Sequence, residues 1–435
     1  MRTESASLRG AGGVIAKFWT ANSFAITGGF FVLASVRMKW INFPFSRDLT
    51  GVELALLRDL SPEPHLQLFS YGIVAILAMI GGLLAQRVSR RILALTAGVL
   101  LTLCILAPLQ VSLQQPAILR RLVVENRELS PIQRFTKDYL PANYGTVADV
   151  PQGISLNTAR ARLITGISFL APGWYMFALG VLLYVVYAVT RTRRSRKLSA
   201  ATFASIPLIA IALSLVRPLI GEWYFYHAIA AQAKAQNADA IADYRRALRY
   251  DPWYSEEMAV YVTIGDLQGN DSGDSPERHV YKAEQLRKAG QYETAIFELE
   301  RAAIAPSRVG KVARRAVAQT RYEYGIALYR AGGIGAAVTS WQRALSSDVS
   351  MSYVLPYLAQ GNFELSRYQS ALETLATIIK ITSHNTLLAN AYSLTGDCYA
   401  KLGHDADARR YYRLSLKTDS IDNHWALSAL VGNTP

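Results

Sequence analysis

Residues 325–344 read GIALYRAGGIGAAVTSWQRA and set the architecture of the C-terminal half. Small residues recur at fixed intervals, at Gly325, Gly332, Ala337 and Ala344, and Trp341 stands between the last two. Small side chains let two helices approach closely, and a large side chain fills the gap that remains. The stretch therefore predicts a helical hairpin that packs through its small residues.

Four further segments repeat this spacing, starting at Ala228, Ala283, Ala359 and Gly396. A unit of about 34 residues cannot bury its own apolar face, so successive hairpins stack into an array. We expect a mobile loop at 265–276, where an insertion rich in Gly and Asp separates the first two units. We also expect a closing helix at 423–431 over the last repeat.

The spacing resembles that of the tetratricopeptide repeat (TPR) family over about residues 222–421. The resemblance implies an α-solenoid whose first helices line a concave face that binds peptides or partner proteins. It places eight residues on that face: Arg287 and Lys288 in the second unit, Tyr322, Tyr329 and Arg330 in the third, and Tyr353, Gln360 and Phe363 in the fourth. Tyr and Arg are enriched in protein-binding hot spots.

A basic run stands near the start of the third unit, at Arg308, Lys311, Arg314, Arg315 and Arg321. One interpretation is a surface that docks acidic protein or lipid headgroups. The other is a solvated helix face balanced by acidic residues at 298, 300 and 323, which we favour because charge runs on helices are mostly solvated.

The N-terminal half contains five apolar stretches of the length that spans a bilayer, about 20 residues. They cover residues 18–36, 66–86, 92–111, 164–190 and 198–216, and none contains Asp, Glu, Lys, Arg or His. We interpret the first as a retained anchor rather than a cleaved signal peptide. Transport coupled to protons or ions requires ionisable groups within the membrane, so the composition argues against it.

The formal net charge of +14 lies entirely in this apolar half. Residues 1–221 hold 23 Lys/Arg against 9 Asp/Glu, and residues 222–435 hold 23 of each. The basic residues gather at the N-terminus and in the turns at 86–91 and 191–199. The positive-inside rule then predicts a cytoplasmic N-terminus and a periplasmic array after five crossings, and no nucleic-acid binding.

Two connections on the predicted outer side have helical patterns. Thr50 and Glu53 form a capping box that predicts a short amphipathic helix as far as Leu60. Residues 118–129 predict a second amphipathic helix, Ser130 starts a further helical stretch, and 141–153 should be extended. We expect these elements to cover the outer face of the membrane bundle.

Motifs for catalysis are missing from the sequence. The six histidines and two cysteines have no metal-ligand spacing, and no phosphate loop, dinucleotide fingerprint or nucleophile elbow occurs. His65 with Arg120 and Arg121 is the one candidate for an outer site that handles a lipid-linked glycan. We therefore expect no cofactor, no metal and no enzymatic activity.

The sequence thus predicts an all-α protein: a five-helix transmembrane bundle at 1–221 and a TPR α-solenoid of about five repeats at 222–435. Its expected role is a non-catalytic scaffold of the bacterial inner membrane that binds membrane or periplasmic proteins. Two alternatives remain: a chaperone-like binder of unfolded clients, as in cytochrome c maturation, and a component of envelope polysaccharide synthesis or export. Homo-oligomers are compatible with the glycine pairs at 28–29 and 81–82.

Overall fold

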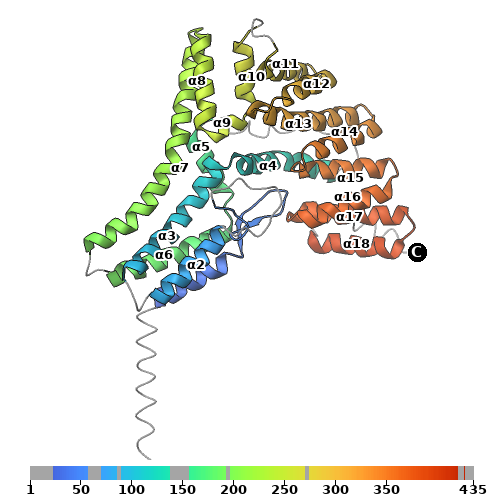
Figure 1. The fold of residues 1–435 in the computed structure, drawn as a ribbon. Helices are drawn as coiled ribbons and strands as arrows, with labels where there is room; N and C mark the ends of the chain where they lie inside the picture. Colours follow the sequence, from blue (N-terminus) through green and yellow to red (C-terminus); the bar gives the residue numbers. More distant parts are fainter. Residues whose placement is uncertain are drawn as a thin grey trace, which may run out of the picture. The chain divides into compact units, whose positions relative to one another are not determined.

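The computed structural model describes residues 23–56, 70–85, 90–137, 156–192, 196–269, 274–419 and Ala426. This part of the chain is predominantly helical (Figure 1), with one short antiparallel pair of strands, β1 (Lys39–Ile41) and β2 (Leu49–Thr50). Contacts divide the chain into two units. Unit 1 comprises Met1–Asn42, Asp48–Gln115 and Ala159–Pro218, and unit 2 comprises Phe43–Arg47, Pro116–Thr158 and Leu219–Pro435.

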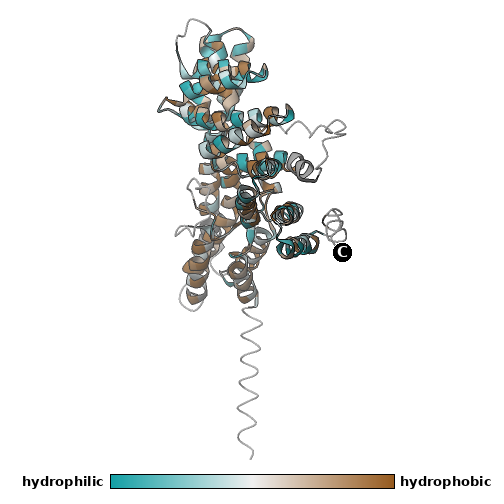
Figure 2. Cartoon of the chain, turned by 90° about the vertical axis from the view of Figure 1, so that its right-hand side faces the viewer, coloured by the Kyte–Doolittle hydropathy of each residue, from teal (hydrophilic) through white to brown (hydrophobic). Residues whose placement is uncertain are grey.

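Unit 1 contains the apolar helices, which Figure 2 colours mainly as hydrophobic. They are Ser23–Ser35, α2 (Tyr71–Ala85), α3 (Arg90–Leu109) with the π-helical turn η1 (Gln110–Gln114), α5 (Ala159–Ser168), α6 (Pro172–Thr192) and the first part of α7 (Arg196–Ala233). Helix α3 packs between α2 and α6. A Cβ atom on Gly28 would lie 2.7 Å from the Gly180 carbonyl oxygen, so this glycine serves a close helix crossing inside the chain.

Three helices in the described part of the chain are long and apolar enough to span a membrane: Ile92–Gln114, Pro172–Arg191 and Ser205–Ala233. The apolar helices Ser23–Ser35 and Tyr71–Gly82 are shorter, and the predicted spans at 18–36 and 66–86 extend into residues outside the described part. The predicted span at 164–190 consists of two helices, because α5 ends at Ser168 and α6 begins at Pro172. There the backbone N–H of Ala171 donates to the Trp40 carbonyl at 2.9 Å.

The structure changes the interpretation of both connections on the predicted outer side. Glu53 does accept from the Thr50 backbone N–H at 2.9 Å, but Thr50 ends β2 and residues 51–56 form turns rather than a helix. Residues 118–129 belong to one continuous helix, α4 (Pro116–Lys137), which continues through Pro131. Helix α4 belongs to unit 2. The stretch predicted to be extended, 141–153, lies outside the described residues.

Unit 2 is an array of helices that pack on one another in chain order (Figure 1). After α7 come α8 (Asn237–Tyr250), α9 (Pro252–Glu256), α10 (Met258–Leu267), α11 (Pro276–Lys288), α12 (Tyr292–Ala303), α13 (Arg308–Arg330), α14 (Ile334–Ser347), the 3₁₀ turn η4 (Ser352–Val354), α15 (Leu355–Glu364), α16 (Tyr368–Ile381), α17 (Asn385–Lys401) and α18 (Asp405–Thr418). The predicted repeats correspond to the hairpins α11/α12, α13/α14, α15/α16 and α17/α18, with α7/α8 as the first.

The small residues of the repeat lie where the helices cross. A Cβ atom on Gly325 would lie 2.3 Å from the Trp341 indole nitrogen, and one on Gly396 would lie 2.5 Å from the Tyr412 ring. Trp341 is fully buried, at 0% exposure. The hairpins α13/α14 and α17/α18 are therefore held by a large ring packed against glycine, as the spacing predicts.

The loop expected at 265–276 differs from the prediction, whereas the expected closing helix falls almost entirely on residues that are not described. The first part of the expected loop is helical, because α10 runs to Leu267 and Gly265 packs closely on the Glu277 carbonyl; residues 270–273 are not described. The closing helix at 423–431 lies outside the described residues, apart from Ala426, which is helical and buried with Ala408 and Tyr412. The division between the units falls after Pro218 inside α7, three residues before the boundary drawn from sequence.

Candidate protein-interaction site

The eight residues predicted for the binding face separate into buried and accessible groups. Tyr322, Tyr353 and Gln360 are buried, at 4–5% exposure. Lys288 and Arg330 are exposed, and the remaining three are half-buried, namely Arg287, Tyr329 and Phe363. The structure therefore gives a partner direct access to only part of the predicted face.

The buried group contacts helix α4. The hydroxyl of Tyr322 donates to Glu128 Oε2 at 3.0 Å, and its ring lies edge-on to the Tyr353 and Tyr357 rings. Burial raises the pKa of the Tyr322 and Tyr353 hydroxyls, so both remain neutral hydrogen-bond donors. Helix α4 packs against α9, η4, α15 and α17, and so covers this part of the array itself.

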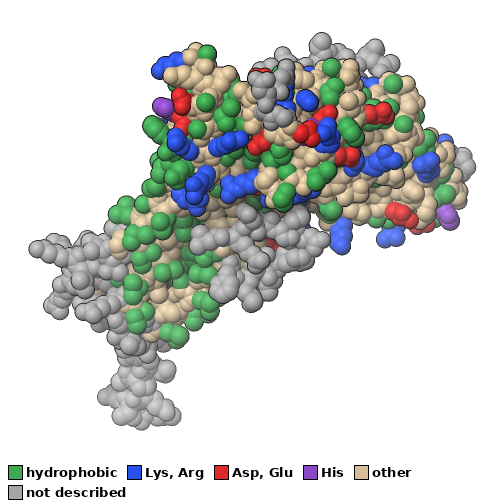
Figure 3. All heavy atoms as spheres, turned by 45° about the horizontal axis from the view of Figure 1, so that its top comes forward, with side chains coloured by type: hydrophobic (Ala, Val, Ile, Leu, Met, Phe, Trp, Pro, Cys, Tyr) green, Lys and Arg blue, Asp and Glu red, His purple; other side chains and the backbone are tan. Residues whose placement is uncertain are grey.

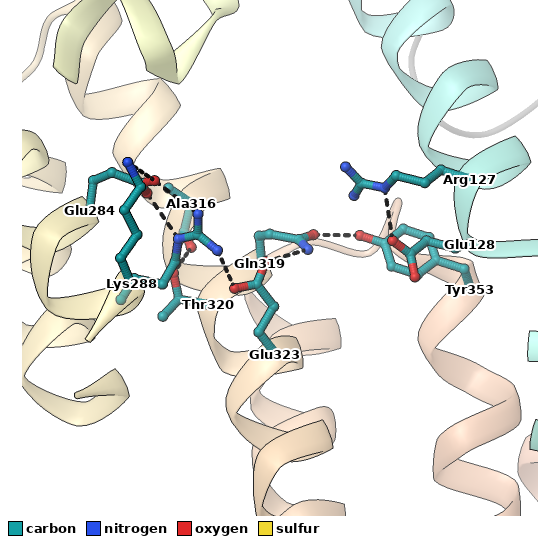
Figure 4. Close-up of polar contacts among 10 residues, drawn as sticks. Arg127, Glu128, Glu284, Lys288, Ala316, Gln319, Thr320, Glu323 and Tyr353 are labelled. Atoms are coloured by element: carbon teal, nitrogen blue, oxygen red, sulfur yellow. Dashed lines mark hydrogen bonds and ion pairs between the residues drawn. The ribbon is translucent and has the colours of Figure 1, made fainter. Parts of the chain in front are cut away.

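A row of hydrogen-bonded polar side chains runs from α11 across α13 to η4 (Figure 4). Tyr353 donates to Gln319 at 2.8 Å, and Gln319 donates to Glu323 at 3.1 Å. Arg287 donates to Glu323 at 2.7 Å and to Glu284 at 2.9 Å. The hydrogen bonds to Glu284 and then Glu323 raise the pKa of Arg287, so its charge is permanent.

Arg287 and Lys288 lie at the accessible end of this row of polar side chains. The Lys288 ammonium lies 3.6 Å from Glu284, and its side chain is 64% exposed. On the neighbouring hairpins, Glu364 accepts from the Tyr329 hydroxyl at 2.6 Å and from the Gln360 amide at 2.9 Å. These surface cations and the tyrosine are thus all held by carboxylates of the array.

The centre of the site is the carboxylate of Glu125 on α4, which is fully buried. It accepts from the backbone N–H groups of Phe45 at 3.1 Å and Ser46 at 3.0 Å, from the Ser46 hydroxyl, and from Arg121 Nε at 2.9 Å. Ser46 Oγ also lies 3.2 Å from Ser352 Oγ of η4. The chain's own loop Phe43–Arg47 thus lies in unit 2 against α4 and η4.

Sequence reasoning missed Glu125, Phe45 and Ser46. Glu125 follows Leu122 by three residues and therefore lies on the apolar face of α4, where an acid is unusual. That position is the signal from which a buried, specifically paired carboxylate could have been inferred. Nothing in the sequence points to its partners, because they lie 79 and 80 residues away.

The basic run is a paired helix face. Lys311 and Arg315 bind Glu256 of α9, at 3.2 and 2.5 Å, and Arg308 and Arg314 donate to backbone carbonyls. On the face drawn in Figure 3, Lys and Arg lie interspersed with Asp and Glu. Arg321, the last residue of the run, pairs with Glu300 at 2.6 Å as the sequence predicts, whereas Lys311 and Arg315 pair with Glu256 instead of the expected acids.

The residues proposed for glycan handling have structural contacts instead. Arg120 donates to Glu257 at 3.0 Å and lies over the Trp253 ring, and Arg121 binds Glu125. His65 lies outside the described residues. No group of three His, Cys, Asp or Glu side chains that could hold a metal ion occurs in the described ranges.

Neither a family model nor a curated protein matches the chain. Solved structures do match, over about half of it. MamA is 17% identical with a TM-score of 0.25, covering 46% of this chain and 97% of its own. YrrB, described as a TPR protein with an unusual peptide-binding site, is 18% identical with a TM-score of 0.26, covering 47% and 89%. PilF of Pseudomonas aeruginosa is 13% identical with a TM-score of 0.29, covering 50% and 99%.

Proposed function

We propose that the protein is a non-catalytic scaffold of a bacterial cytoplasmic membrane, anchored by the apolar helices of unit 1 and binding partner proteins through the helical array of unit 2. The observation that carries the proposal is the Glu125 site, because there the array holds a non-helical segment by its backbone N–H groups and one aromatic side chain. A surface that holds its own loop in this way has the chemistry for holding a segment of another protein.

Of the alternatives, the chaperone-like binder shares this chemistry but predicts weak, exchangeable binding of many clients. The directional contacts of Glu125 favour a particular segment over a promiscuous surface, because a buried carboxylate requires specific donors. The polysaccharide alternative loses support, since Arg120 and Arg121 are paired with Glu257 and Glu125.

The test of the scaffold is purification of the full chain from its native membrane in a mild detergent, followed by mass spectrometry of co-eluting proteins. We expect a partner at constant stoichiometry. The double variant Lys288→Glu with Arg330→Glu reverses two exposed charges on the accessible part of the face, and should weaken that association.

The matched control is Arg343→Glu, an exposed charge reversal on α14, the second helix of its hairpin. It should leave the partner bound. A protein that elutes alone, or a mixture of substoichiometric clients, would contradict the scaffold and favour transient client binding.

A further inference from the structure

The loop between β1 and β2, Phe43–Arg47, lies in unit 2 as an irregular segment with neither helical nor strand pairing. Phe45 is fully buried in the aromatic cluster that contains Tyr322, Trp341 and Tyr357, and Ser46 is 3% exposed. Arg47 is exposed. The segment therefore buries two rings, those of Phe43 and Phe45, and the hydroxyl of Ser46 in the array, and the Arg47 side chain is exposed.

Glu125 binds this segment mainly through its backbone N–H groups. A carboxylate removed from water requires close to a full set of donors, and here two of them are successive backbone N–H groups. Arg121 supplies a third donor and also contacts Ser46 Oγ at 2.6 Å. Proline has no N–H, so a residue filling the position of Phe45 or Ser46 must be a different amino acid, whereas Pro44 is tolerated one place earlier.

The side-chain requirements are equally definite. The position of Phe45 opens into an aromatic cluster, which favours an aromatic ring. The position of Ser46 lies between Glu125 and Ser352, where a hydroxyl both donates and accepts. Phe43 adds a ring 5.1 Å from the Arg121 guanidinium, a cation–π contact.

We propose that the position now filled by Phe45 and Ser46, between Glu125, Ser352 and the buried aromatic cluster, is a peptide-recognition site. Phe43–Arg47 is its resident ligand, and a partner protein displaces it with a non-helical segment carrying an aromatic residue followed by serine or threonine. The proposal rests on the function proposed above. A tethered loop competes at an effective concentration of the order of millimolar, so only a matched segment replaces it.

The experiment uses the full chain in detergent micelles and a dye-labelled peptide of residues 41–49, followed by fluorescence anisotropy. The variant Phe45→Ala removes the ring of the resident loop and weakens its hold. We expect this variant to bind the peptide at least about tenfold more tightly than the wild type, because the tethered competitor is weaker.

The matched control is the same peptide N-methylated at the Phe45 nitrogen, which lacks only the donor to Glu125. Its affinity for Phe45→Ala should fall about tenfold or more. Equal binding of the two peptides, or no binding by a variant whose circular dichroism and unfolding midpoint show it folded, would refute the site.

If Phe45→Ala fails to fold, amide hydrogen exchange of the wild type tests whether the peptide displaces the resident loop. Excess peptide should accelerate exchange of the amides of Phe45 and Ser46, and the N-methylated peptide should not. Unchanged exchange with both peptides would refute displacement. A wild-type dimer that the peptide converts to monomers would make a second copy the occupant, and would equally overturn the proposal.

The outcomes separate this site from the scaffold function. One outcome is a stoichiometric partner that co-purifies equally with wild type and Phe45→Ala, while neither protein binds the peptide. That outcome would support the scaffold function and refute the peptide-recognition site. If no partner co-purifies with the wild type, the scaffold function is refuted, whether or not the peptide binds.

Discussion

At the residue scale, each hairpin turn of unit 2 places one residue in the left-handed region of backbone space. The residues are Ala235, Gly290, Gly332, Ser366 and Gly403, with φ between 56° and 82°. Glycine adopts this conformation without a Cβ clash, whereas alanine and serine are strained there. The second small residue of each repeat, Gly332 in the third unit, is thus required by the backbone conformation at the helix end and not by packing.

Ala235→Gly should consequently stabilise the protein, because Ala235 is exposed and only its strained methyl group is lost. We expect the free energy of unfolding to rise by roughly 0.5–1 kcal/mol, and Gly332→Ala to lower it by about as much. Denaturant unfolding followed by circular dichroism measures both. A decrease for Ala235→Gly would contradict the strain argument.

Glu256 predicts a dependence of stability on pH. Burial raises its pKa, but Arg315 and then Lys311 lower it by more, so the pKa in the folded protein lies below the ordinary 4.5. As the pH falls below about 4.5, the unfolded chain therefore binds a proton that the folded chain resists, and stability is lost down to the folded pKa. Unfolding midpoints from pH 6 to 3 should fall less steeply for Glu256→Gln than for wild type; parallel curves would count against the pairing.

At the scale of the element, the hairpins depend on how closely their helices approach. Gly325 of α13 has the Trp341 ring where a Cβ atom would be, while Gly335 of α14 has no atom within 4 Å of that position. The two glycines are both helical and therefore form a matched pair for substitution.

Gly325→Ala should destabilise the protein by about 1–3 kcal/mol through overpacking, and Gly335→Ala should stabilise it by about 0.5–1 kcal/mol through helix propensity. Thermal unfolding of the two variants beside wild type gives the comparison. If both variants shifted the midpoint in the same direction, close packing of α13 on Trp341 would not be the determinant.

At the scale of the whole molecule, the side of the membrane on which unit 2 lies can be measured by cysteine labelling. The positive-inside pattern of the sequence predicts a cytoplasmic N-terminus and a periplasmic helical array. Both native cysteines, Cys104 and Cys398, are buried and unpaired, so they give little background in a labelling experiment.

Ser346→Cys introduces a thiol on an exposed position of α14. In intact spheroplasts, a membrane-impermeant maleimide should label this variant without permeabilisation. A cysteine introduced at residue 195, in the basic turn, should react only after permeabilisation. The reverse pattern would place unit 2 in the cytoplasm and overturn the proposed localisation.

The repeat array could be derived from sequence because its determinants are local. Helical periodicity, a turn residue and a small residue opposite a ring recur within each unit, so Gly325, Trp341 and Gly332 can be interpreted from their spacing alone. The predicted span at 164–190 was misjudged for the opposite reason. Its interruption before Pro172 coincides with a backbone hydrogen bond from Ala171 to Trp40, a residue far away in the sequence.

The sequence by itself determined that the chain is helical, that one half is apolar and basic, and that the other is an array of hairpins. Only the tertiary structure decided that α4 and the loop at 43–47 belong to that array and that Tyr322 and Tyr353 are buried by it. The physical reason is that periodicity and charge are properties of neighbouring residues. The pairing of Glu125 with Phe45 and Ser46 is a long-range contact that exists only once the chain has folded.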